Sequence, residues 1–168
     1  MDKYNVIDNF LEPTVFKDLK NYIESDTFIW RFSDRCTHLY EHEEAPDYDF
    51  YFYNLIFDHN MICTDQNTWN FINLVLNKLD MKCLRRCKIN SYIKTPKIIH
   101  HKKHIDYDYS HKGAIFSLNT NDGYTVLKDG SEIKSIENRL LLFNPSEEHN
   151  STSCTDSNRR LNINFNYF

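Results

Sequence analysis

The chain has 168 residues, a net charge of -4 and a pI near 6.0. This length suits one domain, and we expect a single domain over 1–168, with helices and supporting strands in 1–81 and core strands in 82–168. The acidic balance argues against a dedicated nucleic-acid binder, which usually carries a basic surface. None of the five cysteines forms a Cys-x-x-Cys pair, so neither a zinc ribbon nor a thioredoxin site is expected.

The N-terminus carries charge and no apolar run follows it. Neither a signal peptide nor a membrane-spanning helix is therefore predicted, and we expect a soluble, cytoplasmic protein without membrane contacts. We interpret the cysteines as reduced packing residues. Cys83 and Cys87 lie four apart, a spacing that would place both on one face of a strand.

In chain order, the N-terminal half predicts two helices among short strands. A strand over 6–10 precedes Pro13 and Thr14, which begin a helix of about ten residues. Strands are expected over 28–32 and in the aromatic stretch 48–57. Thr68 is a candidate N-cap for the second helix, whose apolar face carries Trp69, Phe71, Ile72, Val75, Leu76 and Leu79.

Between two of these strands, residues 33–47 form a polar, acidic stretch that predicts a long loop. Long loops in compact domains often serve function. We expect this loop to be poorly ordered without substrate, to border the site and to act as a lid.

The C-terminal half predicts short strands joined by turns. Asn121-Asp122-Gly123 and Lys128-Asp129-Gly130 are typical hairpin turns. The expected strands cover 83–93, 113–119, 124–128, 132–136, 140–143 and 161–167. Helices followed by many short strands indicate an α+β fold, mainly β, in which the helices pack on one face of a sandwich or barrel.

The last strand alternates strictly. Its apolar residues (Leu161, Ile163, Phe165 and Tyr167) can pack on the helices, and its polar residues (Arg160, Asn162, Asn164 and Asn166) point the other way. A row of one Arg and three Asn facing a barrel interior would be costly without partners. We therefore expect Arg160 to face inward and Arg159 to be solvated.

Three side chains suggest a metal site. His104 and Asp106 flank Ile105, so on an extended segment both point to one side, and His149 follows an apolar strand further along. Two imidazoles and one carboxylate make the facial triad of non-haem Fe(II) oxygenases, with open positions for other ligands. The guanidinium of Arg160 could then grip a carboxylate of a second substrate.

Simpler interpretations stay open for each residue. His104 and Asp106 could be a surface triplet in a His- and Lys-rich stretch, and His149 an exposed loop residue. Arg160 could form a structural ion pair. Among the other histidines, the sequence indicates solvated side chains at His100, His101 and His111. The basic residues are interpreted as a solvated face (Lys82, Arg85, Arg86, Lys88, Lys94, Lys97, Lys102, Lys103 and Lys112).

Taken together, these segments resemble the Fe(II)/2-oxoglutarate-dependent oxygenases, in particular their prolyl 4-hydroxylase-like branch, over essentially the whole length. The run from Asn138 to Phe143, then His149, then 160–166 matches the C-terminal pattern of that branch. The segments Ile89-Asn90-Ser91-Tyr92, Ser117-Leu118-Asn119 and Gly123-Tyr124-Thr125-Val126-Leu127 also resemble family motifs. Asp122, Leu127 and Ser117 depart from these motifs, which bears on the shape of the co-substrate pocket.

The resemblance implies a double-stranded β-helix (jelly-roll) core with N-terminal helices packed on one sheet. It also implies an Fe(II)-dependent dioxygenase that couples hydroxylation to conversion of 2-oxoglutarate and O₂ into succinate and CO₂, with ascorbate as an optional further cofactor. His104, Asp106 and His149 would be the catalytic metal ligands. Arg160, Tyr92, Asn162 and Thr125 would contact the co-substrate.

The substrate itself stays open. A prolyl or other peptidyl residue is expected by resemblance only, and a small molecule is an alternative. The dealkylase branch that acts on alkylated bases carries a second Arg in its last strand, where this chain has Asn166. A nucleic-acid substrate is therefore disfavoured. A non-catalytic binding module on the same fold is the remaining alternative. The oligomeric state is not predicted.

Overall fold

A computed structural model describes residues 4–36 and 47–168 of the chain. Most of the predicted acidic lid, namely 37–46, lies outside the described residues. Within them, two antiparallel sheets and two helices account for the regular structure. No described helix is long and apolar enough to cross a membrane.

The larger sheet carries most of the strands. In spatial order these are β1 (Tyr4–Ile7), β9 (Arg139–Phe143), β6 (Lys112–Ser117), β11 (Arg159–Tyr167), β5 (Leu84–Ile93), β3 (Tyr51–Asp58) and β2 (Arg31–Ser33). The short β4 (Met61–Ile62) pairs with β3. The C-terminal strand β11 lies in the middle of this sheet, between β6 and β5, so its side chains are flanked on both sides.

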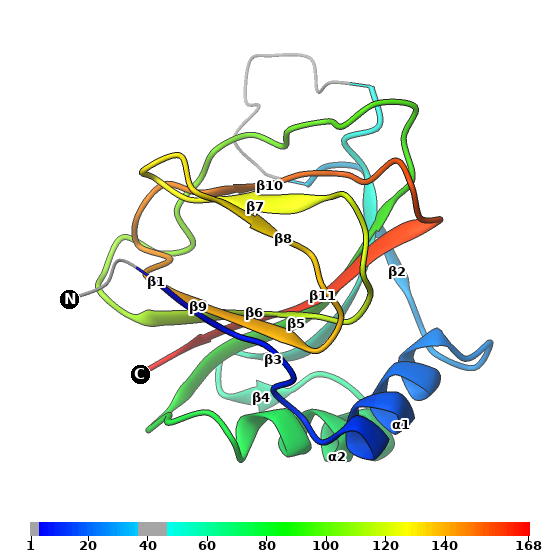
Figure 1. Ribbon diagram of the computed structural model, residues 1–168. Coiled ribbons are helices and arrows are strands. Elements are labelled where there is room, and N and C mark those ends of the chain that lie inside the picture. The colour runs from blue at the N-terminus through cyan, green and yellow to red at the C-terminus, as the bar shows by residue number, and fades with distance from the viewer. Residues whose placement is uncertain (1–3, 37–46) are drawn as a thin grey trace.

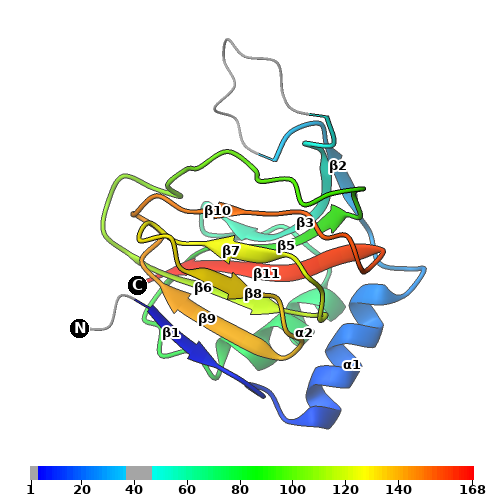
Figure 2. The same cartoon turned by 45° about the horizontal axis from the view of Figure 1, so that its top comes forward.

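The smaller sheet has three strands in the order β10 (Asn150–Ser151), β7 (Tyr124–Val126) and β8 (Glu132–Lys134). It lies over one face of the larger sheet, whereas α1 (Pro13–Glu24) and α2 (Gln66–Leu76) cover the opposite face (Figure 1). Figure 2 shows β7 and β8 crossing above β6, β11 and β9. This is the double-stranded β-helix with helices on one sheet that the sequence predicted.

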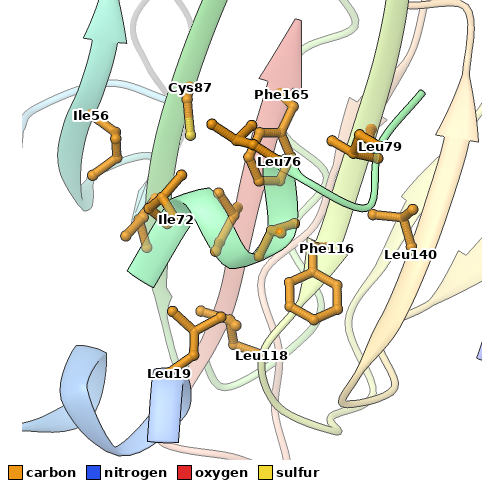
Figure 3. Close-up of a cluster of buried hydrophobic side chains, with 14 of the residues drawn as sticks. Leu19, Ile56, Ile72, Leu76, Leu79, Cys87, Phe116, Leu118, Leu140 and Phe165 are labelled. Carbon is orange, nitrogen blue, oxygen red and sulfur yellow. The ribbon is translucent and has the colours of Figure 1, made fainter. Parts of the chain in front are cut away.

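The apolar row of β11 faces the helices. Leu161, Ile163 and Phe165 are fully buried in the main core, which Figure 3 shows between α2 and the strands. Phe116 of β6 lies at the centre of this core. It meets the rings of Phe10 and Phe16 edge-on, with centroids 5.8 and 6.0 Å apart. This face therefore supplies most of the apolar burial that stabilises the fold.

The helix ends follow from local chemistry, with one correction to the sequence analysis. Pro13 occupies the first turn of α1, where its missing N–H costs nothing. Asp65, not Thr68, caps α2. The Asp65 carboxylate accepts hydrogen bonds from the backbone N–H groups of Asn67 (2.9 Å) and Thr68 (3.0 Å). Thr68 lies inside the helix, where its hydroxyl donates to Asp65 at 2.6 Å.

The prediction that Cys83 and Cys87 lie on one face of a strand is wrong. Cys83 precedes β5 and is exposed, whereas Cys87 is buried under the helices. The register of β5 against β11 shifts near Leu84, and such an irregularity reverses the facing of residues on its two sides. Of the cysteines expected to be packing residues, Cys87 and Cys154 are buried, whereas Cys83 is exposed. The sequence analysis also missed the two-residue strands β4 and β10.

Candidate metal centre

The candidate metal ligands meet at one end of the space between the sheets. His104, in the long connection from β5 to β6, forms an isolated antiparallel bridge with His149, which directly precedes β10. The backbone N–H of His104 donates to the carbonyl of His149 at 2.9 Å, and the reverse bond is 3.0 Å. Two segments far apart in sequence are thereby held in register.

The side chains of His104, Asp106 and His149 each offer one donor atom, and these atoms all lie within 4.8 Å of one another. Nε2 of His104 is 3.6 Å from Oδ1 of Asp106. The Nδ1–H of His104 donates to the Lys102 carbonyl at 3.2 Å, and that of His149 to the Glu147 carbonyl at 2.9 Å. Both rings therefore present Nε2 toward the shared space, which is the orientation seen for metal-bound imidazoles.

The Asp106 carboxylate is buried, with 4% of its side chain exposed. Its Oδ2 has no hydrogen-bond partner among the described residues, although a buried carboxylate oxygen normally has one. Burial raises its pKa, but the nearby His104 ring and the charge of Arg86 outweigh that effect, so the pKa falls well below its usual range. Arg86 Nη2 lies 3.2 Å from Oδ1. The group is thus an anion with an unused oxygen.

Burial also lowers the pKa of His149. A neutral imidazole can donate its Nε2 lone pair to a metal, whereas a protonated ring cannot. Two imidazoles and one carboxylate with an orphaned oxygen match the donor set of a non-haem Fe(II) site. The residues at this end of the sandwich therefore fit such an ion.

Arg160 lies further along the same inner face. It is near the start of β11, the strand in the middle of the larger sheet. It is 1% exposed. Its Nε donates to Ser135 Oγ at 2.7 Å, Nη1 to the Thr152 carbonyl at 3.2 Å and Nη2 to Thr125 Oγ1 at 2.9 Å. All three acceptors are neutral, and no described carboxylate pairs with this guanidinium. Arg159, on the opposite face, lies 3.8 Å from Glu24 and is only partly buried.

Tyr92 is the direct cross-strand neighbour of Arg160 in the β5–β11 register. Its ring centre lies 5.7 Å from the guanidinium carbon. Burial raises the pKa of Tyr92 to about 12, so the phenol keeps its proton and can donate a hydrogen bond. The next inward pair along the strands is Asn90 and Asn162, whose amides bond to each other at 3.0 Å. Asn162 is therefore already engaged, and Thr125 holds Arg160.

Several basic and histidine residues were misassigned by the sequence analysis as solvated. His101 is 3% exposed and packs on Tyr92, with ring centroids 4.9 Å apart. His111 is 7% exposed and bonds to Asn166 Oδ1 at 2.7 Å. The side chains of Arg86 and Lys88 are also partly withdrawn from solvent, with Arg86 beside Asp106 and Lys88 beside Tyr51.

Lys88 belongs to the same row of alternating side chains on β5 as Arg86 and Tyr92. It donates to the Tyr51 hydroxyl at 2.9 Å. Burial lowers its pKa to about 8. The signal available in the sequence was the alternation Arg86, Lys88, Asn90, Tyr92, because these residues share the strand face of Tyr92, which was already assigned to the site.

A cavity of about 310 Å³ lies beside His149. His149 forms part of its wall together with Phe143 and Leu127, and the rim carries Lys128, Asp129, Asn144, Glu147 and Glu148. The ring of Phe143 packs edge-on against His149, with centroids 5.0 Å apart. The His149 side of the candidate centre therefore borders a pocket lined by both apolar and charged residues.

No protein-family model and no curated protein sequence matches the chain. Solved structures do match its fold. A prolyl hydroxylase from Trichoplax adhaerens, in complex with a peptide fragment of the hypoxia inducible factor oxygen degradation domain, is 16% identical with a TM-score of 0.64, covering 100% of this chain and 84% of that one. A viral collagen prolyl hydroxylase from Paramecium Bursaria Chlorella virus-1, in its 2OG complex, is 12% identical with a TM-score of 0.60, covering 98% and 95%.

A third structure contains a different bound molecule. The epimerase SnoN, in complex with Fe3+, alpha ketoglutarate and nogalamycin RO, is 7% identical with a TM-score of 0.66, covering 99% of this chain and 79% of that one. At such identities the likeness establishes the double-stranded β-helix fold of these enzymes over nearly the whole chain.

Proposed function

We propose that the protein is an Fe(II)- and 2-oxoglutarate-dependent dioxygenase. The observation that carries this proposal is the convergence of donor atoms from His104, Asp106 and His149 within 4.8 Å on the inner face of a double-stranded β-helix. Fold alone does not define chemistry, because this architecture hosts many functions. The donor set and its burial supply the chemical argument.

The surroundings of Arg160 support the proposal that 2-oxoglutarate is the co-substrate. A guanidinium that is 1% exposed, with only neutral acceptors around it, is costly unless an anion joins it. Burial lowers the pKa of Arg160, in keeping with that cost. The distal carboxylate of 2-oxoglutarate has the charge and the planar shape that a guanidinium binds in bidentate fashion.

Each residue then has a defined task. His104, Asp106 and His149 hold Fe(II), and the Nδ1 bonds to backbone carbonyls keep both Nε2 atoms aimed at it. Arg160 binds the distal carboxylate, Tyr92 donates its phenol proton to the same group, and Thr125 fixes the guanidinium. When bound, Fe(II) supplies the oxygen activation that couples decarboxylation of 2-oxoglutarate to hydroxylation of a C–H bond.

For the prime substrate we propose a peptidyl residue, prolyl in the first instance. Two of the structural neighbours are prolyl hydroxylases, one with a peptide bound. The cavity beside His149 offers an apolar wall at Phe143 and Leu127 and a rim that carries both signs of charge, which suits a peptide better than a uniformly anionic nucleic acid. The nogalamycin-bound neighbour makes a small molecule the alternative.

The direct test measures succinate release from 2-oxoglutarate with Fe(II), with and without ascorbate, against a panel of proline-containing peptides. We expect 2-oxoglutarate turnover that rises with the right peptide, together with a mass gain of one oxygen on that peptide. His104→Ala should abolish both. Tight binding of a peptide or carbohydrate with no turnover in any arm would support a non-catalytic binding module instead.

A further inference from the structure

A second cluster of metal-binding side chains lies outside the candidate centre. Cys36, Asp49 and His101 each offer one donor atom, and these atoms lie within 4.8 Å of one another. They come from three separate segments: just after β2, just before β3, and the connection between β5 and β6. None of the three belongs to the His104–Asp106–His149 set.

We propose that Cys36, Asp49 and His101 form a second metal site that prefers a thiophilic divalent cation of the Zn(II) class. A thiolate, a carboxylate and an imidazole are all ordinary Zn(II) ligands, and a fourth position is often filled by water. Donor atoms within 4.8 Å of one another need only a small contraction to reach the spacing of a tetrahedral site.

Asp49 supplies independent support. It is 2% exposed, yet its Oδ1 has no hydrogen-bond partner among the described residues. Its Oδ2 accepts the backbone N–H of Cys36, at 3.3 Å. A buried carboxylate with an orphaned oxygen is costly, and a bound cation is one of the few ways to satisfy it.

His101 is oriented as a ligand would be. Its Nδ1 lies 2.7 Å from Ser151 Oγ, and its ring packs on Tyr92. The contact at Nδ1 fixes the ring plane and leaves Nε2 as the nitrogen that can bind a cation. Hydrogen bonds of this kind to the second ring nitrogen are typical of metal-bound histidines.

The charge balance favours a divalent ion. Burial raises the pKa of the Cys36 thiol and of Asp49. Nearby Lys88 favours the Cys36 thiolate, and Arg35 favours the Asp49 carboxylate. A divalent cation held by the Cys36 thiolate and the Asp49 carboxylate would be neutralised by two anions. The thiolate distinguishes this site from the oxygen- and nitrogen-only set that suits Fe(II).

Occupancy would link three segments that the sheets do not join at this point. The chain after β2 and the chain before β3 would be tied to the connection that carries His101. Because His101 packs on Tyr92, the second metal would also fix one wall of the space between Tyr92 and Arg160. The site is therefore structural in character and adjacent to the proposed co-substrate position.

The test uses Co(II) as a spectroscopic probe on the full chain, titrated anaerobically after chelation. The His104→Ala variant removes the candidate iron centre, so the result does not depend on the proposed activity. We expect this variant to bind one Co(II) with thiolate-to-cobalt charge-transfer absorption, and Zn(II) to displace it more readily than Fe(II) does. Wild type should bind two equivalents, only one of which gives the thiolate band.

Cys36→Ser should remove the band and weaken Co(II) binding at this site by at least about 100-fold, since even outer-sphere changes cost 10–100-fold. Cys83→Ser, which alters an exposed cysteine, is the matched control and should leave the titration unchanged. His101→Gln provides a second test if Cys36→Ser does not fold. Absence of the band in His104→Ala, or its persistence in Cys36→Ser, would overturn the proposal.

Discussion

The backbones of His104 and His149 hold each other through two reciprocal hydrogen bonds, of 2.9 and 3.0 Å, and their rings lie 4.6 Å apart between centroids. No strand pairing of any length accompanies this bridge. The bridge therefore positions two imidazoles from distant segments without depending on side-chain contacts. Removing one ring should leave the backbone arrangement in place.

The first prediction follows because the backbone bridge does not depend on the His104 side chain. His104→Ala should weaken Mn(II) or Fe(II) binding at the candidate centre by more than about 100-fold, because a direct ligand is lost. The melting temperature without metal should change little. Isothermal titration with Mn(II) under anaerobic conditions measures the first quantity and circular dichroism the second. His100→Ala is the control, because His100 is exposed and outside the ligand set. Equal metal affinity in the two variants would contradict the assignment.

The second prediction concerns the buried guanidinium. Arg160→Ala should weaken 2-oxoglutarate binding by roughly a hundredfold or more, since loss of one partner of a desolvated charge pair costs about 3–5 kcal/mol. Arg159→Ala should have little effect, because Arg159 lies on the other face near Glu24. Calorimetric titration of the Mn(II)-loaded protein with 2-oxoglutarate provides the measurement. Similar losses in both variants would argue against a clamp at Arg160.

The third prediction tests the cap of α2. Asp65→Ala should lower the free energy of unfolding by about 0.5–2 kcal/mol at neutral pH, because two backbone N–H groups lose their acceptor. Urea denaturation measures the change. Asp26→Ala, which removes an exposed carboxylate, should cost far less.

The same cap makes a pH prediction. The hydrogen bond from the Thr68 hydroxyl lowers the pKa of Asp65 in the folded protein. A lowered pKa contributes stability that is present above the unfolded-state pKa and is lost as pH falls through the folded-state pKa. The stability difference between wild type and Asp65→Ala should therefore shrink at acidic pH. A difference that grows on acidification would exclude this role for the carboxylate.

The fourth prediction concerns the core beneath the larger sheet. Phe116→Ala should destabilise the protein by about 3–5 kcal/mol, because a fully buried ring is replaced by a cavity. Phe32→Ala should cost less than about 1 kcal/mol, since Phe32 is 60% exposed. Chemical denaturation measures the change in the free energy of unfolding for both variants. Comparable losses for the two rings would show that the core is not centred on Phe116.

The alternation of β11 explains why much of the fold could be predicted from the chain alone. A side-chain period of two assigns Leu161, Ile163 and Phe165 to one face and Arg160 and Asn162 to the other, whatever the neighbouring strands. The same local geometry places His104 and Asp106 on one side of Ile105. Wherever a prediction depended on one segment, it needed only backbone geometry and hydrophobic patterning.

Contacts between distant segments were decided by the tertiary structure. His101 looked solvated in a His- and Lys-rich stretch, but the fold places it against Tyr92 of β5 and Ser151 of β10. Arg86 looked like part of a basic face, but it reaches Asp106 because β5 turns this row inward. The cluster of Cys36 and Asp49 with His101 has no spacing signature, because the β2–β3 connection and the β5–β6 connection bring it together. Periodicity defines which way a residue points, whereas only strand register and loop closure define what it meets.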